Sequence, residues 1–202
     1  MELYKVYRPE EAYREIAMKG NTLKALFVDE LRDTYNSEQQ LIKALPKMAK
    51  AAHSDDLRRG FEEHLKQTKL HATRIEQILS GLGEPAKDRK CKGMEGIVAE
   101  GAEVMSEDYE GAVMDAALIS AAQRVEHYEI AAFGCLHAFA TLMGETESAT
   151  LLEQTLGEEK EADQKLSELS KQINSEAFQA DEAIELNQPR PKQKAAKAGS
   201  AR

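Results

Sequence analysis

The sequence predicts an all-α protein organised as an antiparallel four-helix bundle. Ala, Glu, Lys and Leu dominate its composition, Trp is absent, and no clusters of β-branched or aromatic residues indicate a sheet. Four long segments repeat apolar residues at the i, i+3/i+4, i+7 spacing of an amphipathic helix. Each apolar stripe is interrupted near its middle by a carboxylate or a histidine. Because a buried charge needs a partner, we expect the four helices to meet around a shared polar layer.

The whole chain restricts the classes of function. Its 202 residues are enough for one domain with a full core, and its net charge of −9 argues against general binding to nucleic acid. No apolar run approaches the roughly 20 residues that span a bilayer, and the charged N-terminus has no apolar signal core. We therefore predict a cytoplasmic protein that does not enter a membrane. Cys91 and Cys135 have no CxxC partner, which predicts two reduced thiols; a disulfide between them stays open but has no support.

The first helix is predicted over residues 23–52. Residues 1–20 form a polar N-terminal extension, and Asn21 or Thr22 supplies an N-cap. Pro46 lies inside the apolar period, so we expect a kink or a break there.

The second helix is predicted from Ser54 to about Ser80. It is ended by the glycines and the proline of residues 81–85. Apolar residues within 93–106 predict a short extra helix between the second and third long helices, lying across one end of the bundle.

The third and fourth helices form a second hairpin. The third is predicted to start near Tyr109 or Val113 and to end at Met143, closed by Gly144, and the fourth covers 146–174. The bundle domain is thus expected over residues 21–176. Residues 177–202 are expected to be a basic, disordered tail, since the sequence from Asn187 has no acidic residue and no periodicity.

Three carboxylates of the first and third helices are candidate metal ligands. Glu38 is in phase with the apolar stripe of its helix. Glu126 and Glu129 are three residues apart, so both carboxylates lie on one face and could hold one shared cation or two adjacent cations. Glu residues on helices are also commonly solvated, and this alternative stays open for each of them.

The fourth helix adds Glu159 and Asp163, one helical turn apart on its apolar face. Glu158, Glu161 and Glu168 are expected on its solvated side. These positions match the first hairpin in a weak internal repeat, in which Gln67 corresponds to Glu159.

The second helix offers His64 and His71 on its inward face. They are two turns apart, about 10 Å along the axis, so they cannot easily bind one metal together. We favour His71, because it corresponds to Asp163 in the repeat. A lone inward histidine can also be a hydrogen-bonded core residue.

Carboxylates with one or two imidazoles suit iron or manganese and also accept zinc. The hypothesis is a metal centre within the bundle that could oxidise ferrous iron or reduce peroxide. The alternative is a non-enzymatic structural or interaction protein, in which the inward carboxylates form a hydrogen-bonded polar layer without metal. A third interpretation is DNA protection through the basic tail.

Five segments within about residues 22–174 carry a resemblance to a known family: LKALFVDELRDTYNSEQQLIKALPKMAKAA, FEEHLKQTKLHATRIEQIL, CKGMEGIVAEGAEVM, DAALISAAQRVEHYEIAAFG and LLEQTLGEEKEADQKLSEL. The VEHYEIA and MEG sequences are the most specific. In this order, the segments resemble the YciE/YciF-type bacterial stress-response proteins of the ferritin-like, rubrerythrin-related superfamily.

This resemblance implies a ferritin-like bundle, a homodimer, a role in stress, and a di-iron or di-manganese site. Carried over by position, the site draws on seven residues: Glu38, Gln67, His71, Glu126, Glu129, Glu159 and Asp163.

The chain departs from the ferritin-like Glu-x-x-His pattern on two helices. It has Thr68-x-x-His71 on the second helix and Glu159-x-x-Ala162 on the fourth. A single metal, a weakly held pair of metals, or an apo bundle with protonated carboxylates are therefore all open.

Overall fold

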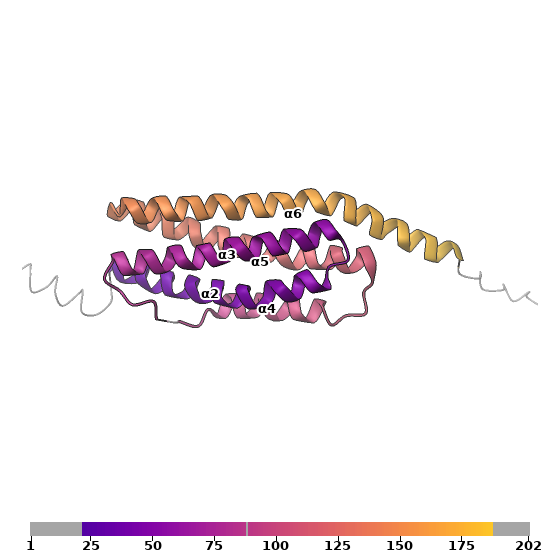
Figure 1. The fold of residues 1–202 in the computed structure, drawn as a ribbon, viewed down its shortest axis with the longest axis horizontal. Coiled ribbons are helices and arrows are strands. Elements are labelled where there is room, and N and C mark those ends of the chain that lie inside the picture. Colours follow the sequence, from indigo (N-terminus) through magenta and orange to yellow (C-terminus); the bar gives the residue numbers. More distant parts are fainter. Residues whose placement is uncertain (1–21, 88, 188–202) are drawn as a thin grey trace, which may run out of the picture.

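The computed structural model describes residues 22–87 and 89–187, which contain five α-helices and the loops between them. Four of them are long and form an antiparallel bundle, and the remaining helix, between the second and third long helices, is short (Figure 1). They are α2 (Leu23–Ala51), α3 (Asp55–Gly81), α4 (Lys92–Val104), α5 (Gly111–Met143) and α6 (Thr146–Asn187). The predicted all-α four-helix bundle with a short extra helix is confirmed. The predicted extension over residues 1–20 and the end of the predicted tail, from 188, lie outside the described residues.

The bundle consists of two helical hairpins. α2 packs along α3, α5 packs along α6, and the hairpins meet through the α2–α5 and α3–α6 contacts. The short link between α2 and α3 is held by the buried Asp115 of α5. Its two carboxylate oxygens accept hydrogen bonds of 2.8 Å from the backbone N–H groups of His53 and Ser54. This contact ties the first hairpin to the second at one end of the bundle.

The helix ends follow the capping residues of the sequence. The Thr22 hydroxyl accepts a hydrogen bond from the Ala25 N–H at 3.1 Å, and Ser54 caps α3 in the same way. Gly144 ends α5 in the left-handed conformation, at φ 74°, which is strained for residues with a Cβ. The caps predicted at Thr22 and Gly144 are confirmed, and the second helix starts at Ser54 as predicted.

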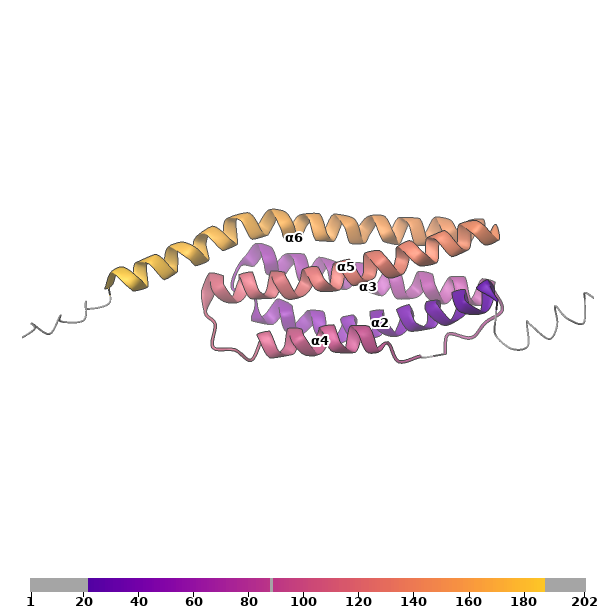
Figure 2. The ribbon, with the colours of Figure 1, turned by 180° about the vertical axis from the view of Figure 1, so that it is seen from behind.

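Two predictions about the helices concern Pro46 and the position of α4. α2 continues through Pro46 without a break, with the buried Leu45 and Met48 beside the proline, and the alternative of a kink stays a prediction. The predicted position of α4 is wrong. α4 lies along the side of α2 and α5 and not across an end of the bundle (Figure 2). Its fully buried Met94 packs into the core between these helices.

The fourth long helix is longer than predicted. α6 continues to Asn187, beyond the predicted end near Asn174. Ile173 and Ala177 are buried, so its apolar face extends past that point, and its C-terminal part projects beyond the other helices (Figure 1). No helix among the described residues is long and apolar enough to cross a membrane.

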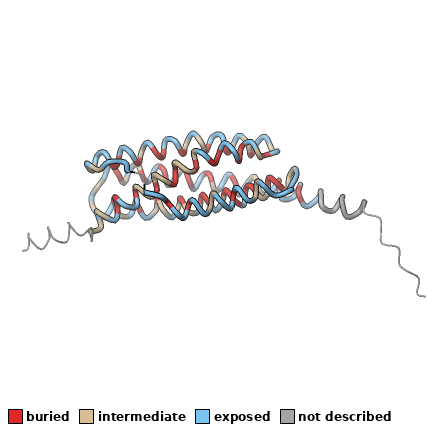
Figure 3. Tube along the Cα trace, turned by 90° about the horizontal axis from the view of Figure 1, so that it is seen from below, coloured by how far each residue is buried: buried red, intermediate tan, exposed pale blue. Residues whose placement is uncertain are grey.

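Buried residues face the interior of the bundle along its whole length (Figure 3). They form two separate apolar clusters. One is built around Phe27, Leu31, Ile75, Phe133 and Leu152. The other is built around Leu41, Leu57, Phe61, Leu118 and Leu166. Along every long helix, the polar layer predicted from the sequence lies between these two clusters.

Candidate metal centre

Six ionisable side chains from all four long helices lie in the polar layer between the two apolar clusters. We call them the carboxylate–histidine cluster. Each is buried, with at most 6% of its surface exposed. The six are Glu38 of α2, His64 and His71 of α3, Glu126 and Glu129 of α5, and Glu159 of α6.

The cluster offers two groups of converging ligand atoms. In one, atoms of His64, Glu126, Glu129 and Glu159 all lie within 4.8 Å of one another. In the other, Glu38, His71 and Glu159 meet the same limit. Glu159 belongs to both groups, so the arrangement can serve two adjacent cations that share a carboxylate.

Ten nitrogen and oxygen atoms of these six side chains are buried and make no hydrogen bond among the described residues, although two of them, Nδ1 of His71 and Oε1 of Glu159, face each other at 2.8 Å as an ion pair. They include both carboxylate oxygens of Glu38, Glu129 and Glu159 and both ring nitrogens of His64. Buried polar atoms in proteins are nearly always satisfied, and leaving one unsatisfied costs about 1–3 kcal/mol. So dense a set of unsatisfied donor atoms fits a bound metal ion, because coordination would satisfy them together.

Burial makes three of the carboxyl groups hard to ionise. It raises the pKa of Glu38 to about 8. Burial, reinforced by the neighbouring carboxylates, raises the pKa values of Glu126 and Glu129 well above the ordinary range. In the absence of a cation, these groups are therefore protonated at neutral pH.

Glu159 and His71 form the charged pair of the cluster. Glu159 Oε1 lies 2.8 Å from His71 Nδ1. Burial, the largest influence, would raise the pKa of Glu159 and lower that of His71. Their mutual contact, together with His64 beside Glu159 and with Glu38 and Glu158 beside His71, shifts each pKa the other way. Burial lowers the pKa of His64, which is therefore neutral and able to donate a lone pair.

His71 is oriented by a carboxylate outside the cluster. Its Nε2 lies 2.8 Å from Oε2 of Glu158, and the Arg74 guanidinium binds both oxygens of this carboxylate, at 2.6 and 3.0 Å. Burial would raise the pKa of Glu158, but the hydrogen bonds from Arg74, His71 and Gln154 hold it at about 2. Because Glu158 is ionised and accepts, Nε2 carries a proton and Nδ1 faces the cluster.

The structure brings together five of the predicted site residues: Glu38, His71, Glu126, Glu129 and Glu159. It leaves Asp163 outside both groups. One turn beyond Glu159, and about 40° further around α6, Asp163 accepts a hydrogen bond from Gln123 and lies 3.4 Å from the exposed His127. Gln67 is half-buried and lines a pocket beside His64.

Sequence reasoning missed two residues of this region. The sequence favours His71 over His64 as a ligand, yet both are in the cluster, one in each group of ligand atoms. Its inward phase on α3 was the signal. Glu158 was expected on the solvated side of α6 but binds His71 and Arg74. A basic residue at position 74, one turn after His71, was the available clue.

The chain is similar to bacterial proteins over most of its length. A family model described as a domain of unknown function, DUF892, matches residues 22–179. Protein YciF of Escherichia coli K12 is 42% identical over 154 residues, which are 76% of this chain and 93% of YciF. The crystal structure of the E. coli stress protein YciF superposes with a TM-score of 0.74 at 41% identity, covering 76% of this chain and 98% of that one.

Two further solved structures have the same fold. YcfI of Rhodopseudomonas palustris has a TM-score of 0.70 at 39% identity, covering 72% of this chain and 93% of that one. A dodecameric, bacterioferritin-related thioferritin of Bacteroides fragilis has a TM-score of 0.58 at 16% identity, covering 86% of this chain and 98% of that one. The second match concerns the fold alone. The bundle is ferritin-like, as predicted.

Proposed function

This chain belongs to the DUF892 family and is similar to YciF, and we propose that its bundle binds a pair of iron or manganese ions. The observation that carries the proposal is the set of ten buried, unpartnered donor atoms in the carboxylate–histidine cluster. An apolar cluster lies on each side of these atoms along the bundle. A pair of cations between the helices would satisfy them.

The number and type of ligands also support two metals. Ferritin-like dinuclear centres use four carboxylates and two imidazoles, drawn from two Glu residues and two Glu-x-x-His pairs. This chain lacks the carboxylate at Thr68 and the imidazole at Ala162. Glu129 and His64 add one carboxylate and one imidazole from other positions, so the cluster again holds four carboxylates and two imidazoles.

We assign Glu38, His71 and Glu159 to one ion, and His64, Glu126 and Glu129 together with Glu159 to the other. The ions would supply Lewis acidity and, as ferrous iron, electrons for oxygen or peroxide. Glu158 accepts a hydrogen bond from the proton on Nε2 of His71, so that Nδ1, which faces Glu159, is the atom that would bind an ion. The E. coli relative is described as a stress protein, and we propose stress defence for this chain as well.

The second candidate is a structural bundle whose polar layer binds no metal. It is favoured by the raised pKa values of Glu38, Glu126 and Glu129, because protonated carboxyls can bond to one another and to Glu159. Such a layer would fix the register of the helices.

Metal analysis of protein purified without chelators tests the proposal directly. We expect close to two equivalents of iron or manganese, or their uptake when Fe(II) is added under air. Less than about a tenth of an equivalent, with no uptake, would favour the structural candidate. A Glu38→Gln variant should lose metal, whereas the exposed Glu153→Gln on α6 should not.

The homodimer stays a prediction from the resemblance, and the cytoplasmic location stays a prediction from the sequence. Light scattering of the purified chain measures the first, and cell fractionation measures the second. A gel-shift assay before and after removal of residues 187–202 tests whether the basic tail binds DNA.

A further inference from the structure

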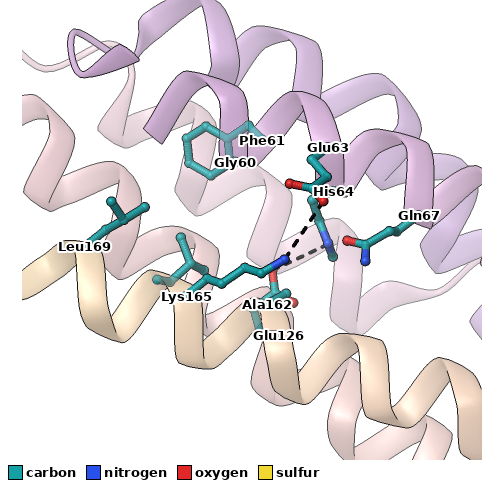
Figure 4. Close-up of a pocket in the computed structure, with 10 residues that line it drawn as sticks. Gly60, Phe61, Glu63, His64, Gln67, Glu126, Ala162, Lys165 and Leu169 are labelled. Atoms are coloured by element: carbon teal, nitrogen blue, oxygen red, sulfur yellow. Dashed lines mark ion pairs between the residues drawn. The ribbon is translucent and has the colours of Figure 1, made fainter. Parts of the chain in front are cut away.

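A pocket opens between α3 and α6 directly beside the carboxylate–histidine cluster. The α3 side is lined by residues from Gly60 to Gln67, and the α6 side by residues from Ala162 to Leu169. Glu126 of α5 also lines the pocket. Figure 4 shows His64 and Glu126 close together in the pocket, with a dashed line marking their contact.

The interior of the pocket presents buried polar atoms. His64 and Glu126 are at least nine-tenths buried, and their facing atoms, Nε2 and Oε1, are 3.4 Å apart. Both nitrogens of His64 and Oε2 of Glu126 have no hydrogen-bond partner within the described part of the chain. A molecule in this pocket would therefore lie against the two side chains that carry these atoms.

Two small residues keep the pocket open. Ala162 lies one turn after Glu159, where a ferritin-like helix carries an imidazole, and its methyl group fills much less space. Gly60 lies opposite, on α3, and a Cβ added there would meet no atom within 4 Å. The space measures about 40 Å³, enough for a few small atoms but too little for a metabolite.

Charged side chains lie at the mouth of the pocket. The ammonium group of Lys165 on α6 lies 3.9 Å from Oε1 of Glu63 on α3, and both side chains are more than half exposed. Figure 4 shows Lys165 reaching across the mouth towards Glu63. So exposed a pair is weak, and it can open without large cost to the fold.

We propose that this pocket is where a small exogenous ligand, two or three heavy atoms with an oxygen or nitrogen donor, reaches the carboxylate–histidine cluster. The ligand takes the place that an imidazole at position 162 would fill. The binding of the ligand to a metal rests on the proposed function. The access of small molecules to the pocket does not, because it depends only on the residues that line the pocket.

The first experiment needs no metal. In a Cys135→Ser background, the thiol introduced by Ala162→Cys should react with methyl methanethiosulfonate about a hundred times faster than the thiol introduced by Ala140→Cys, at a fully buried core position. Adding Gly60→Leu, which places a side chain in the pocket, should slow the reaction of the thiol at position 162 about tenfold. Adding Gly157→Leu, the same change at an exposed helical glycine outside the pocket, should leave the rate unchanged. Mass spectrometry measures each rate.

The second experiment uses azide as the probe on Co(II)-loaded protein. The Gly60→Leu variant should bind azide about tenfold more weakly than the wild type and than Gly157→Leu, with an unchanged affinity for Co(II). The proposal is overturned if the thiols at positions 162 and 140 react at equal rates. It is also overturned if Gly60→Leu changes neither the reaction rate of the thiol at position 162 nor the affinity for azide. A wild-type protein that takes up no metal contradicts the proposed function instead, and the thiol rates then decide alone whether the pocket admits small molecules.

Discussion

The Nε2 atom of His71 lies 2.8 Å from Oε2 of Glu158, one residue before the cluster ligand Glu159. Two consecutive carboxylates of α6 thus contact the two ring nitrogens of one imidazole, since Nδ1 lies 2.8 Å from Glu159. Arg74 fixes Glu158 from the solvent side with two hydrogen bonds. This chain of contacts sets the tautomer of His71, which is the role that an outer carboxylate has in many metal sites.

Glu158→Gln should therefore weaken metal binding without removing a ligand. The neutral amide holds neither Arg74 nor the His71 proton as firmly, and we expect the affinity for Mn(II) to fall about 10–100-fold. Competition with a coloured chelator measures this change. Glu161→Gln, at an exposed position of the same helix, is the control. Equal affinities in the two variants would show that the tautomer of His71 is set without Glu158.

The Glu126→Leu variant distinguishes between the two candidate functions, a metal centre and a structural polar layer. Glu126 is 3% exposed and lies 3.4 Å from His64. If the cluster holds metal, the variant should bind at most about half of the wild-type metal, while the free energy of unfolding of the apo protein stays equal or rises, because a buried acid is replaced by an apolar group. Elemental analysis and urea unfolding measure the two quantities. Unchanged metal content would remove Glu126 from the ligand set.

The fold could be predicted from the sequence because its determinants are local. The apolar period, the caps at Thr22 and Ser54, and the glycine at 144 each act within one helix. Five cluster residues could be predicted for the same reason, since a polar residue on an apolar stripe must point inward. The position of α4 could not, because packing along α2 and α5 depends on long-range contacts.

His64 and Glu158 show the limit of this reasoning. Whether an inward histidine joins a cluster depends on what the facing helices place opposite it, here Glu126 and Glu159. Glu158 lies on the polar side of α6 by helical phase. It contacts the cluster because His71 and Arg74 of α3 lie opposite this side of α6 and bind its carboxylate. Both facts concern pairs of helices, which a single apolar stripe does not encode.

The stability of the apo protein should fall as the pH rises from about 5 to about 8. Glu38 keeps its proton in the folded state up to a pKa of about 8, whereas the unfolded chain loses it near 4.5. The folded state therefore binds more protons in this window, and the free energy of unfolding decreases with pH, by up to roughly 1.4 kcal/mol per pH unit for each such carboxyl. The raised pKa of His71 acts in the same direction above its unfolded value of 6.5.

Urea unfolding with EDTA at four pH values across this window measures the slope. Saturating Mn(II) should flatten it, because bound ions replace the protons of the carboxyls. The Glu38→Gln variant should also show a smaller slope in EDTA. A wild-type stability that is constant with pH would contradict the buried, protonated state of these groups.

Asp115→Ala should destabilise the bundle without affecting its metal site. Both oxygens of Asp115 accept backbone hydrogen bonds from the link between α2 and α3, and the residue is 3% exposed. Removing the carboxylate leaves two N–H groups without acceptors, and we expect a loss of about 2–4 kcal/mol. Asp115→Asn keeps one acceptor oxygen and should lose less, and Asp108→Ala, at an exposed position, should lose almost nothing. Since Asp115 lies three helical turns from Glu126, all three variants should bind as much metal per folded chain as the wild type. A fall in metal content for Asp115→Ala under folding conditions would mean that the link between α2 and α3 also positions the ligands of α3.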